Sequence, residues 1–201
     1  MKKSVWCGIV SLLLLMAVCL LSCKEKIRNR RDLIVYVNDP VNGLKKIEQI
    51  GKIKAAFTYK PWQLMGIKSQ TVSNKSEKPY PFKFKDKLFF VLSLSANDKE
   101  LLRQLQFSQY GEMVQVLAFR MNEFIEAVPD DKKPVRPLEC TFQQTYGMGT
   151  ANNLLIVFNK EKLMAASDLK IRVKEFGLNT GDLNFAIKTK DIKDIQNIAL
   201  N

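Results

Sequence analysis

The sequence predicts a mainly β protein, an antiparallel β-sandwich or barrel-like domain with one or two short helices. Apolar and polar residues alternate with a period of two over several short segments, most cleanly over residues 138–146, as in strands with one buried face. Turn residues such as Asp39-Pro40 and Asn42-Gly43 separate these segments. No regular succession of strand and helix is visible, which disfavours a parallel sheet.

The elements follow from these patterns in chain order. Short apolar or alternating runs predict about ten strands, at residues 33–37, 44–50, 53–59, 88–94, 113–119, 123–128, 138–146, 154–158, 169–173 and 183–187. Gly51 marks a tight hairpin, and Gly147-Met148-Gly149 marks a turn. Asn97 is placed to cap a short helix with Glu100 in the capping-box position. Further short helices are expected over residues 160–166 and near Asp191.

The N-terminus has the parts of an export signal. A positive segment, Met1-Lys2-Lys3, precedes an apolar stretch from Val5 to Leu21. This stretch is shorter than the roughly 20 apolar residues of a spanning helix. It ends in Leu20-Leu21-Ser22-Cys23, which resembles the lipobox of bacterial lipoproteins.

The resemblance implies cleavage between Ser22 and Cys23 and attachment of lipid to the Cys23 thiol. It divides the chain into a signal peptide (1–22), a lipidated cysteine with a basic tether (23–31) and one β-rich domain (32–201). The expected location is the cell envelope. Lys24 follows the cysteine, and in this family that favours the outer over the inner membrane.

Composition excludes several chemistries. The chain has no histidine, which rules out His-dependent nucleophiles and zinc sites with His ligands. Cys7 and Cys19 lie in the signal and Cys23 carries lipid, so Cys140 is the only free thiol expected. Cys140 alternates with Leu138 and Phe142 on an apolar face, and we expect a buried, unreactive thiol. No cofactor and no metal site is expected.

Positive charge is concentrated near the N-terminus. Of the net charge of +12, residues 44–87 contribute eleven Lys against three acidic residues. Alternation predicts a candidate anion-binding face formed by Lys52, Lys54, Lys60, Lys83, Lys85 and Lys87. The alternative is a solvated face whose lysines protect sheet edges from aggregation, and charge patterning alone favours this alternative.

These observations favour a non-catalytic binding or structural module of the cell envelope. The expected partners are the membrane, through the lipid on Cys23, and an envelope protein, an anionic glycan or a lipid headgroup. An exported location argues against nucleic acid. The alternative function is a hydrolase that acts on envelope polymers without a His-dependent mechanism.

Overall fold

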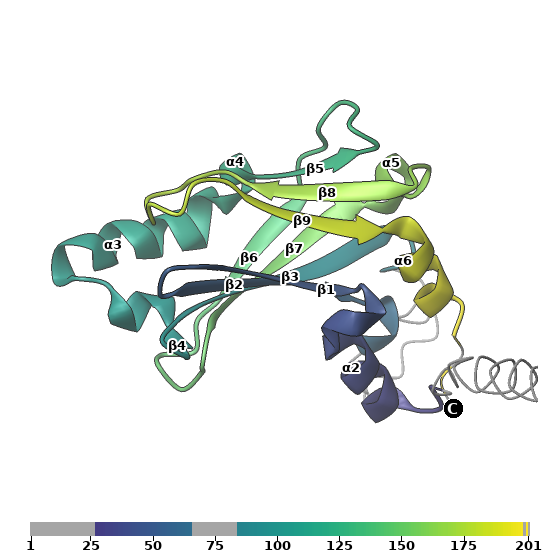
Figure 1. The fold of residues 1–201 in the computed structure, drawn as a ribbon, viewed down its shortest axis with the longest axis horizontal. Helices are drawn as coiled ribbons and strands as arrows, with labels where there is room; N and C mark the ends of the chain where they lie inside the picture. Colours follow the sequence, from purple (N-terminus) through teal and green to yellow (C-terminus); the bar gives the residue numbers. More distant parts are fainter. Residues whose placement is uncertain (1–26, 66–83, 199, 201) are drawn as a thin grey trace, which may run out of the picture.

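The computed structural model describes residues 27–65, 84–198 and 200, and within them two antiparallel sheets share one core (Figure 1). The larger sheet contains β1 (Lys45–Ile50), β2 (Ile53–Lys60), β3 (Lys87–Ala96), β4 (Lys99–Glu100), β6 (Glu139–Gln143) and β7 (Asn152–Asn159). The smaller sheet contains β5 (Ile125–Pro129), β8 (Asp168–Val173) and β9 (Leu183–Lys188). The helices are α2 (Arg30–Asn38), α3 (Phe107–Gln115), α4 (Met121–Phe124), α5 (Lys160–Met164) and α6 (Thr189–Gln196).

The larger sheet runs in the order β1-β2-β3-β7-β6, with β4 paired to the end of β3. The β1–β2 register follows from a two-residue turn, because Ile50 pairs with Ile53 across Gly51-Lys52. Gly51 has a φ of +57°, a conformation that glycine adopts without steric cost. Alternate residues of each strand therefore face either the core or the outer surface.

The core lies between the two sheets. Phe57 on β2 stacks on Phe90 of β3 and on Phe185 of β9, with ring centroids 5.1 and 5.4 Å apart. Phe57, Phe90 and Phe185 are at most 1 % exposed. This two-sheet packing confirms the predicted fold class, a mainly β, antiparallel, sandwich-like domain.

Residues 33–37 form a helix, so the strand predicted there is wrong. The Asn29 side chain accepts hydrogen bonds from the backbone N–H groups of Arg31 and Asp32, which caps α2. The spacing of Leu33 and Val37 suits a helix, and both are buried. Helix α2 begins inside the segment predicted as a tether. The β-branched residues in this segment are typical of strands. The Asn29 cap and the contacts of Leu33 and Val37 with the core nevertheless determine a helical conformation.

Residues 113–119 are also helical rather than a strand. They span the end of α3 and a turn of π-helix at Val116–Arg120. Met113, Val116 and Leu117 are at most 5 % exposed, which is the i, i+3, i+4 spacing of a buried helix face. Because α2, α3 and α6 each have eight or nine residues, helical content exceeds the one or two short helices predicted.

Asn97 does not cap a helix. Asn97 and Asp98 both have positive φ values, 52° and 57°, and form the two-residue turn between β3 and β4. Residues 101–104 do form a short 3₁₀ helix, but its N-cap is Glu100, whose side chain binds a distant loop instead of the helix.

Candidate functional site

The predicted basic face does not form one patch. Lys54 and Lys60 are half-buried on the outer surface of β2. Lys52 lies in the turn at the other end of that strand, about 26 Å from Lys60 at the rise of an extended chain. Lys85 lies over the Trp62 ring, 5.7 Å from its centroid, and Lys87 begins β3 opposite Asn159. Lys83, Ser22 and Cys23 lie outside the described residues.

Lys54 and Lys60 line a trough on the outer face of the larger sheet. The trough consists of two depressions of about 420 and 330 Å³ that share Asn38, Thr58 and Ser93. Small side chains form its floor, because Lys54 pairs with Ser95 and Ala56 pairs with Ser93. We use "trough" for this surface, whose principal residues are Asn38, Lys45, Lys54, Ala56, Thr58, Lys60, Ser93, Ser95 and Asn153.

Lys45 is not one of the six lysines of the predicted anion-binding face, but it lies opposite Thr58 in the β1–β2 hairpin and also lines the trough. The turn at Gly51 fixes that register, so the position of Lys45 opposite Thr58 could have been predicted from the sequence. Among the described residues, Lys45, Lys54 and Lys60 form no ion pair or side-chain hydrogen bond. Asp98 is the acidic residue that lines the trough. The trough therefore presents cationic groups and hydroxyls in excess of carboxylates.

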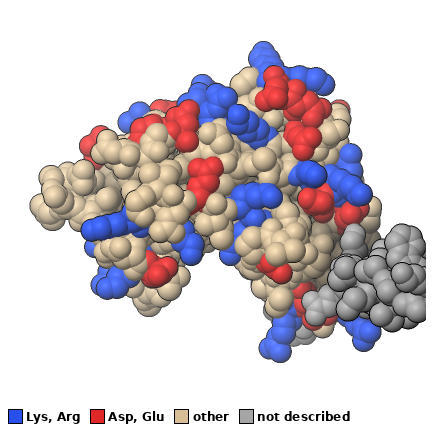
Figure 2. Space-filling model, in the orientation of Figure 1, with Lys and Arg blue, Asp and Glu red and all other residues tan. Residues whose placement is uncertain are grey.

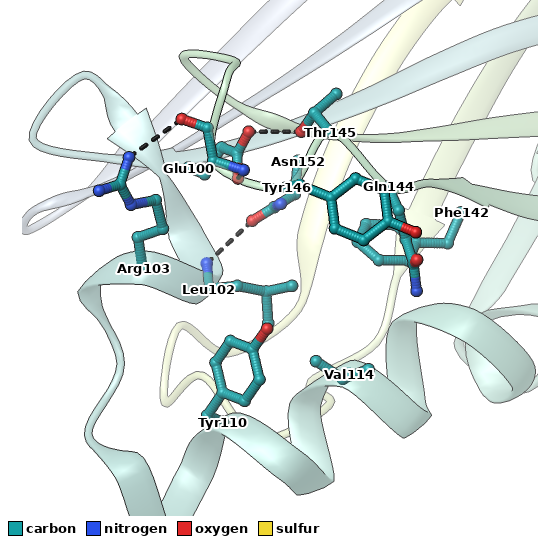
Figure 3. A pocket seen from close by; sticks show the side chains of 11 residues that line it. Glu100, Leu102, Arg103, Tyr110, Val114, Phe142, Gln144, Thr145, Tyr146 and Asn152 are labelled. Carbon is teal, nitrogen blue, oxygen red and sulfur yellow. Dashed lines mark hydrogen bonds between the residues drawn. The ribbon is translucent and has the colours of Figure 1, made fainter.

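A separate depression, of about 430 Å³, lies between α3, the 3₁₀ helix at Leu101–Gln104 and the loop that follows β6 (Figure 3). Tyr110 and Val114 enter it from α3, and Tyr146 lies across from them on the loop. We call this depression the aromatic pocket. It is lined by Glu100, Leu102, Arg103, Tyr110, Val114, Phe142, Gln144, Thr145, Tyr146, Gly147 and Asn152.

Glu100 holds the loop that forms one wall of this pocket. Its carboxylate accepts hydrogen bonds from the Thr145 hydroxyl and from the backbone N–H groups of Gly147 (3.0 Å) and Gly149 (2.8 Å). Burial would raise the pKa of this carboxyl group, but the donated hydrogen bonds and the nearby Arg103 guanidinium outweigh burial and lower the pKa below its ordinary value.

The loop at residues 144–151 is a wall shared by the trough and the aromatic pocket. Its residues 144–147 line the aromatic pocket, whereas residues 149–151 line the trough. Arg103 adds a hydrogen bond of 3.0 Å from its guanidinium to the Gly147 carbonyl. Glu100 and Arg103 thus hold the loop that borders both the trough and the aromatic pocket.

Among the described residues, the aromatic pocket lacks the pair of carboxyl groups that glycoside hydrolysis normally uses. That chemistry commonly needs two carboxyl groups about 5–10 Å apart, one of them with a raised pKa. Glu100 is the only carboxylate among the described residues that line the pocket, and its pKa is lowered. Its hydrogen bonds go to the loop and favour the ionised carboxylate.

Cys140 faces the core on β6 and is partly buried against it. Burial, with a smaller contribution from the Glu139 carboxylate, raises the pKa of the thiol to about 12. The thiolate is the reactive form. At pH 8 we therefore expect a disulfide reagent such as DTNB to modify Cys140 much more slowly in the folded protein than in denaturant. Equal rates in the two conditions would show an accessible thiol and contradict this prediction.

Comparison with protein-family models, with curated proteins and with solved structures finds no match for this chain. None of the helices in residues 27–65 and 84–198 has both the length and the apolar composition needed to span a bilayer. Within the same residues, no three carboxylate or thiol side chains are grouped as a metal site would require.

Proposed function

We propose that this protein is a lipid-anchored binding module of the bacterial cell envelope and that its trough binds an anionic glycan. The observation that carries the proposal is a set of three half-buried lysines, Lys45, Lys54 and Lys60, on a floor with hydroxyl groups. None of the three forms an ion pair with an acidic residue in the part of the chain that the structure describes. Partial burial weakens the hydration of an ammonium group, and a bound anion compensates for that loss.

The spacing of the lysines favours a chain over a single small ion. Lys54 and Lys60 are six residues apart on one strand, which corresponds to about 20 Å. Thr58 lies between them and faces the same side of the sheet as Lys45 on the neighbouring strand. A glycan with repeated carboxylate or phosphate groups can contact all three lysines, and its hydroxyl groups can pair with Thr58 and Ser95.

The anchor supports a role close to a membrane. Cys23 lies four residues before Ile27, so a lipid on Cys23 would lie within about 14 Å of the first described residue. More than one acyl chain is needed for stable attachment, and the lipobox resemblance implies a diacylglycerol on the thiol. A trough that is held near the membrane would keep a polymer of the envelope close to the anchor.

The test measures binding of the mature lipoprotein, in an uncharged detergent, to polygalacturonate at low and high salt. Triple charge reversal at Lys45, Lys54 and Lys60 to Glu should weaken binding about tenfold or more at low salt. High salt should weaken binding of the unaltered protein, because exposed charges are screened.

A matched control reverses Lys162, Lys170 and Lys190, three exposed lysines outside the trough. This variant has the same net charge, so a weaker effect supports a localised site. Equal losses in both variants would indicate a diffuse charge effect and contradict the proposal. Binding to phosphatidylglycerol vesicles but not to polygalacturonate would also contradict it, because the ligand would then be a lipid headgroup.

A further inference from the structure

The aromatic pocket lies at the end of the domain farthest from its N-terminal entry. In Figure 1 the described chain enters beside α2 at one end of the long axis, and α3 lies at the other end. The tip formed by α3 carries few charged side chains in Figure 2. Aromatic rings are exposed there, with Phe107 at 98 %, Tyr146 at 84 % and Tyr110 at 47 %. Exposed rings grouped around a pocket are typical of binding sites.

The backbone holds Tyr146 in an uncommon conformation. Tyr146 has a φ of +51° and Gly147 a φ of +81°, and the left-handed region costs a non-glycine residue roughly 1–3 kcal/mol. The hydrogen bonds to Glu100 and from Arg103 fix the neighbouring loop residues. Local strain at an exposed ring, supported by a buried carboxylate, indicates a side chain that is positioned before a ligand arrives.

The polar groups of the pocket suit a neutral ligand with many hydroxyl groups. The exposed Gln144 amide lies beside the Tyr146 ring, and the Arg103 guanidinium lines the same pocket. Arg103 and Glu100 balance each other in charge, so this pocket lacks the cationic excess of the trough. Planar amide and guanidinium groups can each pair with two neighbouring hydroxyls, while the C–H face of a sugar ring packs on an aromatic ring.

We propose that the aromatic pocket is a saccharide-binding site that takes a neutral sugar ring stacked on Tyr146. Its volume of about 430 Å³ is within the range of roughly 300–1,000 Å³ found for small-ligand sites. Tyr110 and Val114 close the opposite side, and Gln144 and Arg103 orient the hydroxyl groups. The loop at residues 144–151 borders both this pocket and the trough, but the proposal does not rest on the anionic ligand proposed for the trough.

The test uses the mature lipoprotein and a panel of neutral oligosaccharides built from glucose, galactose, mannose and N-acetylglucosamine. Binding is measured by saturation-transfer NMR and by calorimetric titration. Tyr146→Ala should reduce the affinity for the bound sugar about tenfold or more, whereas Tyr146→Trp should retain it because a ring remains. The charge-reversed variant of the trough should bind the sugar normally, which separates this proposal from the proposed function.

Phe119→Ala is the matched control, because Phe119 is 80 % exposed but does not line the pocket. The control should leave sugar binding unchanged. Failure of every oligosaccharide to bind at millimolar concentration would overturn the proposal. An equal loss in the Tyr146→Ala and Phe119→Ala variants would also overturn it.

Discussion

Replacing Cys23 with Ala should abolish incorporation of a fatty-acid analogue and release or mislocalise the protein. The thiol is the only atom in the lipobox to which the diacylglycerol thioether can attach, so we expect an all-or-none effect. A protein that is cleaved but carries no acyl chain has no lipid anchor, whereas uncleaved precursor keeps the apolar stretch from Val5 to Leu21. The measurement is metabolic labelling with an alkyne fatty acid, followed by fractionation of the cells.

Cys19→Ala supplies the matched control for this experiment. Cys19 lies four residues earlier, inside the predicted signal, and its loss should leave labelling unchanged. The size of the protein adds a second readout, because uncleaved precursor retains residues 1–22. Full labelling of the Cys23→Ala variant would exclude this residue as the lipid attachment site.

Glu100→Ala should lower the free energy of unfolding by about 2–4 kcal/mol, the largest stability effect that we expect from a single polar residue here. The substitution removes the acceptor for Thr145, Gly147 and Gly149. Their donors then lose a charged partner in a site where Glu100 was only 3 % exposed. Urea unfolding followed by circular dichroism measures the change.

Glu112→Ala is the corresponding control, since Glu112 is exposed on α3. We expect it to change stability by less than about 0.5 kcal/mol. Glu100→Gln should have an intermediate effect. The amide keeps one acceptor oxygen, but its NH₂ group replaces the second oxygen and faces the donors of the loop. A Glu100→Ala protein as stable as the Glu112→Ala protein would show that the loop does not depend on this carboxylate.

Acid should weaken the same interaction. The folded-state pKa of Glu100 is below its ordinary value. Its contribution to the free energy of unfolding is therefore complete at a pH above the ordinary glutamate pKa. The contribution is lost as pH falls through the lower folded-state pKa. Glu175 behaves alike, because it accepts backbone hydrogen bonds from Gly177, Leu178, Asn179 and Thr180, and its pKa is also lowered.

Local patterns predicted the strands well where a turn fixed their register. The alternation after Gly51 correctly placed Phe57 in the core and Lys54 on the outer face. The same patterns failed at residues 33–37 and 113–119, where apolar β-branched residues occur inside helices. At these positions the Asn29 cap and the contacts of Met113 and Leu117 with the core outweigh intrinsic strand propensity.

Neither the trough nor the aromatic pocket could be predicted from local sequence patterns. The trough needs the strand order β2-β3-β7, which brings Ser93 beside Asn153 sixty residues later. The aromatic pocket needs Glu100 to bind a loop more than forty residues away. In the sequence Glu100 resembles a helix capping residue, and only the tertiary contact reveals its partner. Patterns in a single sequence indicate local periodicity, but they do not indicate which distant segments pair, such as β3 with β7 or Glu100 with its loop.

Because one loop borders both the trough and the aromatic pocket, binding at one site can affect binding at the other. If an anionic ligand in the trough shifts residues 149–151, the position of Tyr146 changes with them, because Glu100 ties both parts of the loop together. Any factor by which this ligand alters sugar affinity must then equal the factor by which the sugar alters binding of the anion. A tenfold effect would correspond to a coupling free energy of about 1.4 kcal/mol. If the coupling is positive, the protein binds more tightly where both ligands are present.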